Sequence, residues 1–141
     1  MRPAFLALVV GLSLTGAAFA AGMTVKDEMK AVVDPATNTI FAVGGDVDPA
    51  NGPEAAKVPD ARWQEALKAA QSLKAAAQDL NGPQKKPGAE WIKSAADFAK
   101  LADDAERAAM KKDGAAFSTA ANALGDTCTA CHSKYKAQTG D

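Results

Sequence analysis

Two cysteines and a histidine stand together near the end of the chain, in the stretch Cys128-Thr129-Ala130-Cys131-His132. This stretch contains the only two cysteines and the only histidine among the 141 residues. The C-x-x-C-H spacing is typical of covalent haem attachment, in which two thiols add across the vinyl groups of the porphyrin and the adjacent imidazole ligates the iron. The motif therefore predicts thioether bonds at Cys128 and Cys131 and an iron ligand at His132.

Other kinds of site can use the same side chains. A structural zinc site has four ligands, and after two thiolates and His132 the chain has no cysteine or histidine left, so carboxylates would have to complete it. A thiol–disulfide redox pair usually lies at a helix N-terminus beside a parallel strand, which is not the context of this pair. A disulfide would close a very small loop, which stabilises little, and would leave the histidine unexplained. Haem attachment accounts for all three residues.

The first twenty residues have the pattern of a secretory signal peptide. Met1-Arg2 is positively charged, residues 3–14 are almost wholly apolar, and Ala18-Phe19-Ala20 fits the small-x-small rule for cleavage. The apolar run is shorter than the roughly 20 residues that a membrane-spanning helix needs, and no second apolar stretch follows. We therefore predict a signal peptide at 1–20, export to the periplasm and no membrane anchor after cleavage.

The remaining residues, 21–141, suit one domain with one modest core. Cleavage removes Arg2 and no acidic residue, so the formal charge falls from −1 to about −2. This balance argues against a general nucleic-acid binder or a protein of anionic membrane surfaces. The abundance of alanine, lysine, glutamate, aspartate and leucine favours helices, and no strand pattern competes.

The hydrophobic periodicity predicts an all-α fold, an antiparallel four-helix bundle, and the C-x-x-C-H motif adds covalently bound haem to it. The predicted helices cover residues 24–41, 60–80, 89–112 and 113–137, with a Pro/Gly-rich crossover loop at 43–59.

The first predicted helix carries several local signals. Thr24 and Asp27 have capping-box spacing, and Gly44-Gly45 is expected to end the segment. Pro35 predicts a kink or two short helices, with Asp34 capping the second.

The last predicted helix carries the motif on its apolar stripe. Its apolar residues recur in steps of three and four: Phe117, Ala121, Leu124, Cys128, Cys131 and Tyr135. Residues at this spacing share one face of a helix, and His132 lies almost above Cys128. We therefore expect the motif to face the interior of the bundle, where a flat and largely apolar cofactor fits.

A C-terminal C-x-x-C-H motif, on the last helix of an exported four-helix chain, resembles the class II c-type cytochromes, the cytochrome c prime group. The resemblance covers the whole chain after cleavage. Most c-type cytochromes carry the motif near the N-terminus, so its C-terminal place is a specific feature. The resemblance implies that Cys128 and Cys131 carry the haem thioethers and that His132 is the proximal iron ligand. Tyr135 and Lys136 match the aromatic and basic positions that often follow the histidine in this family.

The resemblance also implies that the residue facing the other side of the iron comes from the first helix. A methionine sulfur there would make the iron six-coordinate and suited to electron transfer, whereas an apolar side chain would leave it open to a small gas. Met23 lies near the terminus after cleavage and Met110 near the end of the third helix. Met29 lies on the apolar face of the first helix and is the candidate distal ligand; the alternative is a packed methionine beside an open site. Val25 stands where the family more often has a basic residue.

We therefore predict a periplasmic monohaem c-type cytochrome that carries haem c, shuttles single electrons between redox partner proteins and is not an enzyme. Lys26 and Lys30 could reach the haem propionates. The alternative is a five-coordinate cytochrome c prime that binds nitric oxide or carbon monoxide, and a third reading is a structural bundle with incidental thiols. The resemblance also suggests a homodimer through the first two helices, although Trp63, Trp91 and Phe41 can serve either a core or an interface.

Overall fold

The computed structural model describes residues 23–52, 57–82, 85 and 88–136, and these are helical with short connections. The predicted signal peptide at 1–20 lies outside the described residues. No strand occurs in the described ranges, which confirms the all-α prediction. In the same ranges, no helix is both long and apolar enough to cross a membrane.

Three long helices match the sequence prediction closely. They are α3 (Asp60–Leu80), α4 (Ala89–Lys111) and α5 (Gly114–Tyr135). Lys112 adopts a left-handed conformation, with a φ of 53°, and ends α4. Asp113 then caps α5, because its carboxylate accepts a hydrogen bond of 3.0 Å from the backbone N–H of Ala116. The sharp reversal between α4 and α5 follows from these two adjacent residues.

The first predicted helix is one helical run in three parts: α1 (Val25–Glu28), the π-helical turn η1 (Met29–Val33) and α2 (Asp34–Asp46). Thr24 caps α1 as expected, and its hydroxyl accepts a hydrogen bond of 3.1 Å from the N–H of Asp27. α2 continues through Gly44-Gly45 to Asp46, so the expectation that these glycines end the helix is wrong.

The π-helical turn is the response of the chain to Pro35. A proline inside a helix has no N–H to donate, and its ring collides with the carbonyl four residues before it. The N–H of Asp34 instead bonds to the carbonyl of Met29, five residues back, which widens the turn just before the proline. Asp34 is thus the first residue of α2 and makes no capping hydrogen bond with its side chain, so the predicted cap at this position is wrong.

The helices form a closed set of contacts around one core. α3 packs against α4, α4 packs against α5, and α2 contacts both α3 and α5. Trp63 and Phe117 meet edge to face with their ring centroids 5.8 Å apart, and both are buried. The indole N–H of Trp91 donates a hydrogen bond of 2.8 Å to the carbonyl of Leu80, which fixes the start of α4 on the end of α3. Both tryptophans therefore belong to the core.

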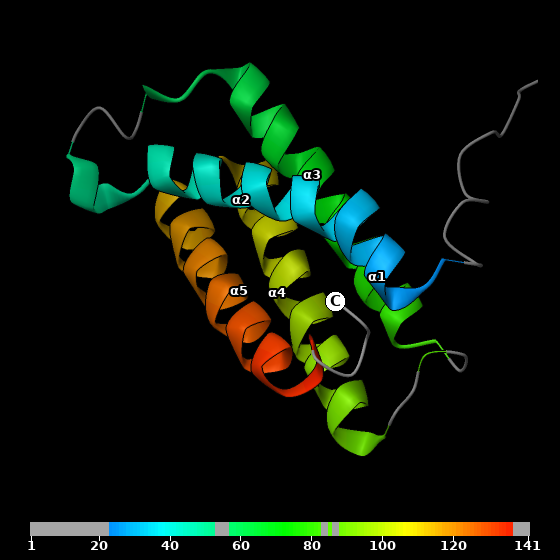
Figure 1. Cartoon of the computed structure of the whole chain (residues 1–141). Coiled ribbons are helices and arrows are strands. Elements are labelled where there is room, and N and C mark those ends of the chain that lie inside the picture. The colour runs from blue at the N-terminus through cyan, green and yellow to red at the C-terminus, as the bar shows by residue number, and fades with distance from the viewer. Residues whose placement is uncertain (1–22, 53–56, 83–84, 86–87, 137–141) are drawn as a thin grey trace, which may run out of the picture.

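The predicted crossover loop is shorter than expected, because α2 extends to Asp46. A short 3-10 helix, η2 (Pro49–Asn51), follows, and residues 53–56 lie outside the described part of the chain. Arg62 of α3 pairs with Asp46 at 2.6 Å and so joins the two ends of the connection. Figure 1 shows that α1 lies at the same end of the molecule as the last turns of α5. The topology thus brings the two ends of the described chain together.

Candidate functional site

The motif lies where the buried stripe of α5 runs out towards the surface. Phe117, Ala121 and Leu124 are buried, whereas Cys128 and Cys131 are half-buried and His132 is exposed. The predicted inward face of the cysteines is therefore correct in direction, but the interior there is open to one side. Both thiols are free in this structure.

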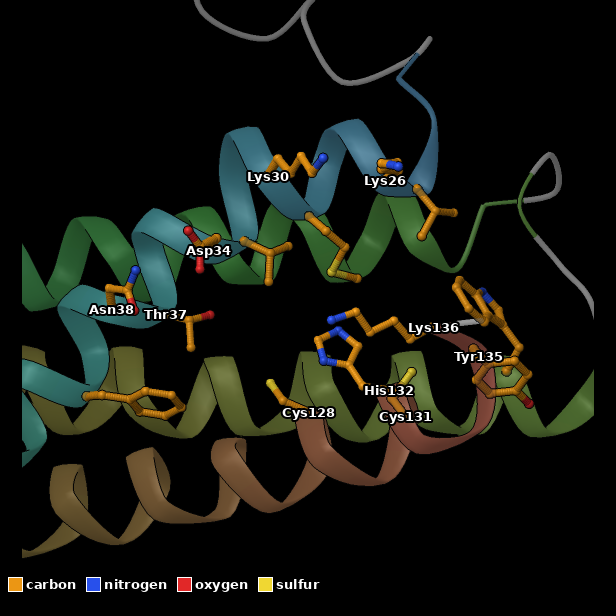
Figure 2. Close-up of a pocket in the computed structure, with 15 residues that line it drawn as sticks. Lys26, Lys30, Asp34, Thr37, Asn38, Cys128, Cys131, His132, Tyr135 and Lys136 are labelled. Carbon is orange, nitrogen blue, oxygen red and sulfur yellow. The ribbon is translucent and has the colours of Figure 1, made fainter. Parts of the chain in front are cut away.

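The three motif side chains line one cavity of about 350 Å³ between α5 and the α1–η1–α2 run. Figure 2 shows Cys128 and His132 pointing from α5 towards the helical run that carries Lys30 and Asp34. Most of the surface of the cavity is apolar, and its lining residues come from both ends of the chain: Val25, Lys26, Met29, Lys30, Val33, Asp34, Thr37, Asn38, Phe41, Trp91, Cys128, Cys131, His132, Tyr135 and Lys136.

Met29 lines the same cavity as His132, so the structure brings together the four residues singled out from the sequence. It is half-buried and packs against the core at the first position of η1. Met110, by contrast, is 66% exposed near the end of α4 and lines no part of this cavity. Met23 does not line it either. Met29 is thus the one methionine of the described residues whose sulfur shares a cavity with the imidazole.

Burial raises the pKa of both cysteine thiols above the ordinary value, and at Cys128 the neighbouring Cys131 adds to the effect. A thiol with a raised pKa is mostly protonated near neutral pH and is therefore a weak nucleophile for disulfide exchange. No positive charge or helix N-terminus lowers the pKa of either thiol, since the two cysteines lie in the last two turns of α5. These electrostatics disfavour a catalytic thiol–disulfide pair.

A self-contained metal site is not formed by these residues. Within the described ranges, no three His, Cys, Asp or Glu side chains are grouped so that they could hold a metal ion. The arrangement offers one imidazole and one thioether in one cavity, which suits a metal that brings its own equatorial ligands, as haem iron does. The donor set of the cavity thus fits haem better than zinc.

Three aromatic side chains line the cavity: Phe41, Trp91 and Tyr135. Trp91 of α4 and Tyr135 of α5 meet edge to face with ring centroids 5.1 Å apart. Tyr135 packs against the core, in agreement with the sequence prediction, and also lines the cavity. Phe41 of α2 lines the far end and is 41% exposed. Lys134 is exposed and forms an ion pair with Glu90.

The rim of the cavity is polar on the side of α1 and α2. Lys26 and Lys30 supply positive charge there and Asp34 supplies a carboxylate, while Lys136, which follows α5, lines the cavity from the other side. Haem carries two propionates, so the lysines make this rim suitable for its acidic edge. The hydroxyl oxygen of Thr37 is buried and has no hydrogen-bond partner among the described residues, although Thr37 lines the cavity.

A second, smaller cavity of about 50 Å³ lies beneath the first. Its lining is almost entirely apolar and includes Met29, His132, Phe98 and Leu80. Six of its lining residues, Met29 and His132 among them, also line the larger cavity, so the two spaces adjoin the same pair of candidate ligands.

Two residues of this region were not singled out from the sequence. Glu28 is 1% exposed, although it precedes Met29 in a segment with charged neighbours. Lys85 lies between α3 and α4 and pairs with it. The sequence signal for Glu28 is the presence of a glutamate on the apolar side of an amphipathic helix. Its partner Lys85 is distant in the sequence, so the pair could not be identified in this way.

Comparisons of the chain with models of known protein families, with curated proteins and with solved structures found no match. The resemblance to class II c-type cytochromes therefore rests on the motif, its place in the last helix and the residues around it. The geometry of the cavity adds an independent line of argument, because it depends on residues far from the motif.

Proposed function

We propose that the chain is a periplasmic monohaem c-type cytochrome with the antiparallel four-helix arrangement of the cytochrome c prime group, and that it carries single electrons. One observation carries the proposal: Cys128, Cys131, His132 and Met29, from opposite ends of the chain, line one cavity. If the C-x-x-C-H match were a coincidence on a structural helix, there would be no reason for a methionine and an apolar cavity to lie beside it.

Each residue has a distinct task in this proposal. Bound haem supplies a one-electron iron couple, whose potential is raised by a thioether ligand. Cys128 and Cys131 would hold the cofactor covalently, and His132 and Met29 would be the two protein ligands of its iron. Trp91, which is buried on α4, lines the cavity from that side. No group is assigned a catalytic role, since electron transfer requires only that the cofactor be held with little rearrangement.

The expected partners are redox proteins of the periplasm, reached after removal of residues 1–20. The slightly acidic balance of the chain and the lysines at the rim support a protein partner better than a nucleic acid. Phe41 is exposed at one end of the cavity, which is compatible with a homodimer as well as with a monomer. Light scattering after size exclusion distinguishes the two.

The first test is a pyridine haemochrome spectrum of the protein expressed with a c-type maturation system. A covalent c-type spectrum is expected, and a protein without covalent haem would refute both haem readings together.

The second test is Met29→Ala, with Met110→Ala as the matched control. The wild type is expected to be low-spin in both oxidation states, to resist carbon monoxide when reduced and to show a weak far-red sulfur-ligation band when oxidised. Met29→Ala should be high-spin, bind carbon monoxide readily and have a lower potential, because a soft ligand that favours ferrous iron is lost. Met110→Ala should behave as the wild type, since its side chain is exposed elsewhere.

The second candidate function is a five-coordinate protein that binds nitric oxide or carbon monoxide. The small apolar cavity beside Met29 and His132 favours it, because about 50 Å³ exceeds the space that one water-sized molecule needs. A high-spin wild type that takes up carbon monoxide at once would select this function. Met29 would then be a wall of the gas pocket, and its replacement should change gas affinity and leave the spin state alone.

A further inference from the structure

The helix that carries the candidate distal ligand is anchored by a buried charge. α1 is the first turn of the helical run that continues through η1 into α2, so it is attached to the rest of the run at its C-terminal end only. Its one fully buried side chain is Glu28, which is 1% exposed; Val25 is only partly buried. A buried carboxylate is strongly unfavourable unless a cation and hydrogen bonds compensate it. The position of α1 therefore depends on the partner of Glu28.

That partner is Lys85, in the connection between α3 and α4. The lysine Nζ lies 2.5 Å from Oε2 of Glu28, and its side chain is only 10% exposed. Lys85 also pairs with Asp79 of α3, which holds the ammonium group in place. The second oxygen of Glu28, Oε1, is buried and has no hydrogen-bond partner in the described part of the chain. Lys85 thus provides most of the charge compensation for the buried Glu28. Its removal would leave the neighbouring carboxylates of Glu28 and Asp79 without their cation.

The residue after Glu28 is Met29, which faces the cavity. Met29 opens the π-helical turn, whose wide hydrogen bonding arises from Pro35 and differs from the regular α-helical pattern. Val33, at the other end of the turn, is buried in the core. The orientation of Met29 is therefore set from two sides, by Val33 and by the anchored Glu28.

We infer that Glu28 and Lys85 are positioning residues that hold the sulfur of Met29 towards the part of the cavity in which the iron would be bound. The inference rests on the proposed function, in which Met29 is the distal ligand. Neither residue lines the cavity, so both act through the placement of α1 and the first residue of η1. Loss of the pair is expected to raise the population with an open iron site while His132 stays bound.

The experiment uses the haem-loaded protein and compares Lys85→Met with Lys93→Met. Lys93 is a fair control because it too forms an ion pair, with Asp97, but on the exposed face of α4, whereas Lys85 pairs with the two carboxylates of Glu28 and Asp79. Carbon monoxide titration of the reduced protein, the low-spin fraction and the far-red band are measured, with helicity from circular dichroism. The apparent carbon monoxide affinity of Lys85→Met should rise about tenfold or more, because it scales with the populated fraction of the open state. Lys93→Met should match the wild type.

A second variant guards against simple misfolding. Glu28→Gln combined with Lys85→Met removes both buried charges and leaves Asp79, which is partly solvated. It should fold, because replacing a buried pair by neutral groups is far milder than breaking it, and it should still bind carbon monoxide more readily than the wild type. Lys85→Arg keeps the cation and should restore the low-spin spectrum.

The outcomes separate the two levels of the argument. A wild type that lacks covalent haem or is high-spin refutes the proposed function before any variant is measured. A low-spin wild type whose Lys85→Met and double variants retain helix, low-spin iron and resistance to carbon monoxide overturns the positioning role alone. Helical variants that open the iron, rescued by Lys85→Arg, support it.

Discussion

The contact between Gly44 of α2 and Ala121 of α5 gives the sharpest stability test. A Cβ atom added at Gly44 would lie 2.7 Å from the Cβ of Ala121, whereas ordinary contact begins at 3.4 Å. The neighbouring Gly45 has nothing within 4 Å of its added Cβ and is exposed. Both glycines lie in α2, so Gly44→Ala and Gly45→Ala differ mainly in this collision.

The expected magnitudes follow from two opposing effects. Replacing glycine by alanine within a helix is worth about 0.5–1 kcal/mol. Overpacking a close contact costs about 1–3 kcal/mol, because both partners are backbone-linked Cβ atoms that cannot rotate away. The helix term is common to both variants, so Gly44→Ala should be less stable than Gly45→Ala by about 1–3 kcal/mol. At about 4 °C per kcal/mol for a domain of this size, the melting temperatures should differ by about 4–12 °C.

The assay is thermal and urea unfolding of both variants in the same haem-loaded form, followed by far-ultraviolet circular dichroism. Gly45→Ala should be at least as stable as the wild type. Equal melting temperatures for the two variants would refute the close approach of α2 to α5 at Gly44. Because α2 and α5 both line the cavity, Gly44→Ala should also weaken the low-spin spectrum if the two helices separate.

Three further outcomes are expected. Cys128→Ala with Cys131→Ala should abolish haem retention on dialysis against a haem acceptor and lower helicity, because the emptied cavity cannot easily collapse; retention of both would contradict the motif assignment. Phe117→Ala should lower the free energy of unfolding by about 3–5 kcal/mol in urea titrations, since the ring is fully buried. The pKa of Glu106 is lowered by hydrogen bonds from Lys74 first and then from a glutamine of α3. The stability that Glu106 contributes is thus present above the ordinary glutamate pKa and lost as the pH falls through the lower folded value, and Glu106→Gln should remove this part of the acid dependence of urea unfolding.

The bounds of α3, and nearly those of α4 and α5, could be read from the sequence because their signals are local. Asn81 follows the end of α3 and Asp113 caps α5, each at the position where the pattern stops. The shared face of Cys128 and Cys131 is likewise a matter of helical spacing. These predictions need no knowledge of what the helix touches.

The π-helical turn and the passage of α2 through Gly44 could not be read in the same way. Pro35 indicates a disturbance, but whether the helix breaks, kinks or widens depends on what holds it on either side. A glycine such as Gly44 usually indicates the end of a helix, yet here the absence of a side chain allows Ala121 of α5 to pack against it. A local pattern records the preference of a segment and not the neighbour that overrides it.

The sequence by itself determined the all-α class and the three motif residues on one face of the last helix, since both follow from composition and spacing along the chain. Only the tertiary structure decided that Met29 shares a cavity with His132 and that Glu28 is buried. The reason is separation along the chain: Glu28 and its cation lie 57 residues apart, and Met29 shares a cavity with α5 because α2, in the same helical run as Met29, packs against α5. Whether a polar group can be buried, or a sulfur can face an imidazole, depends on groups that no local pattern contains.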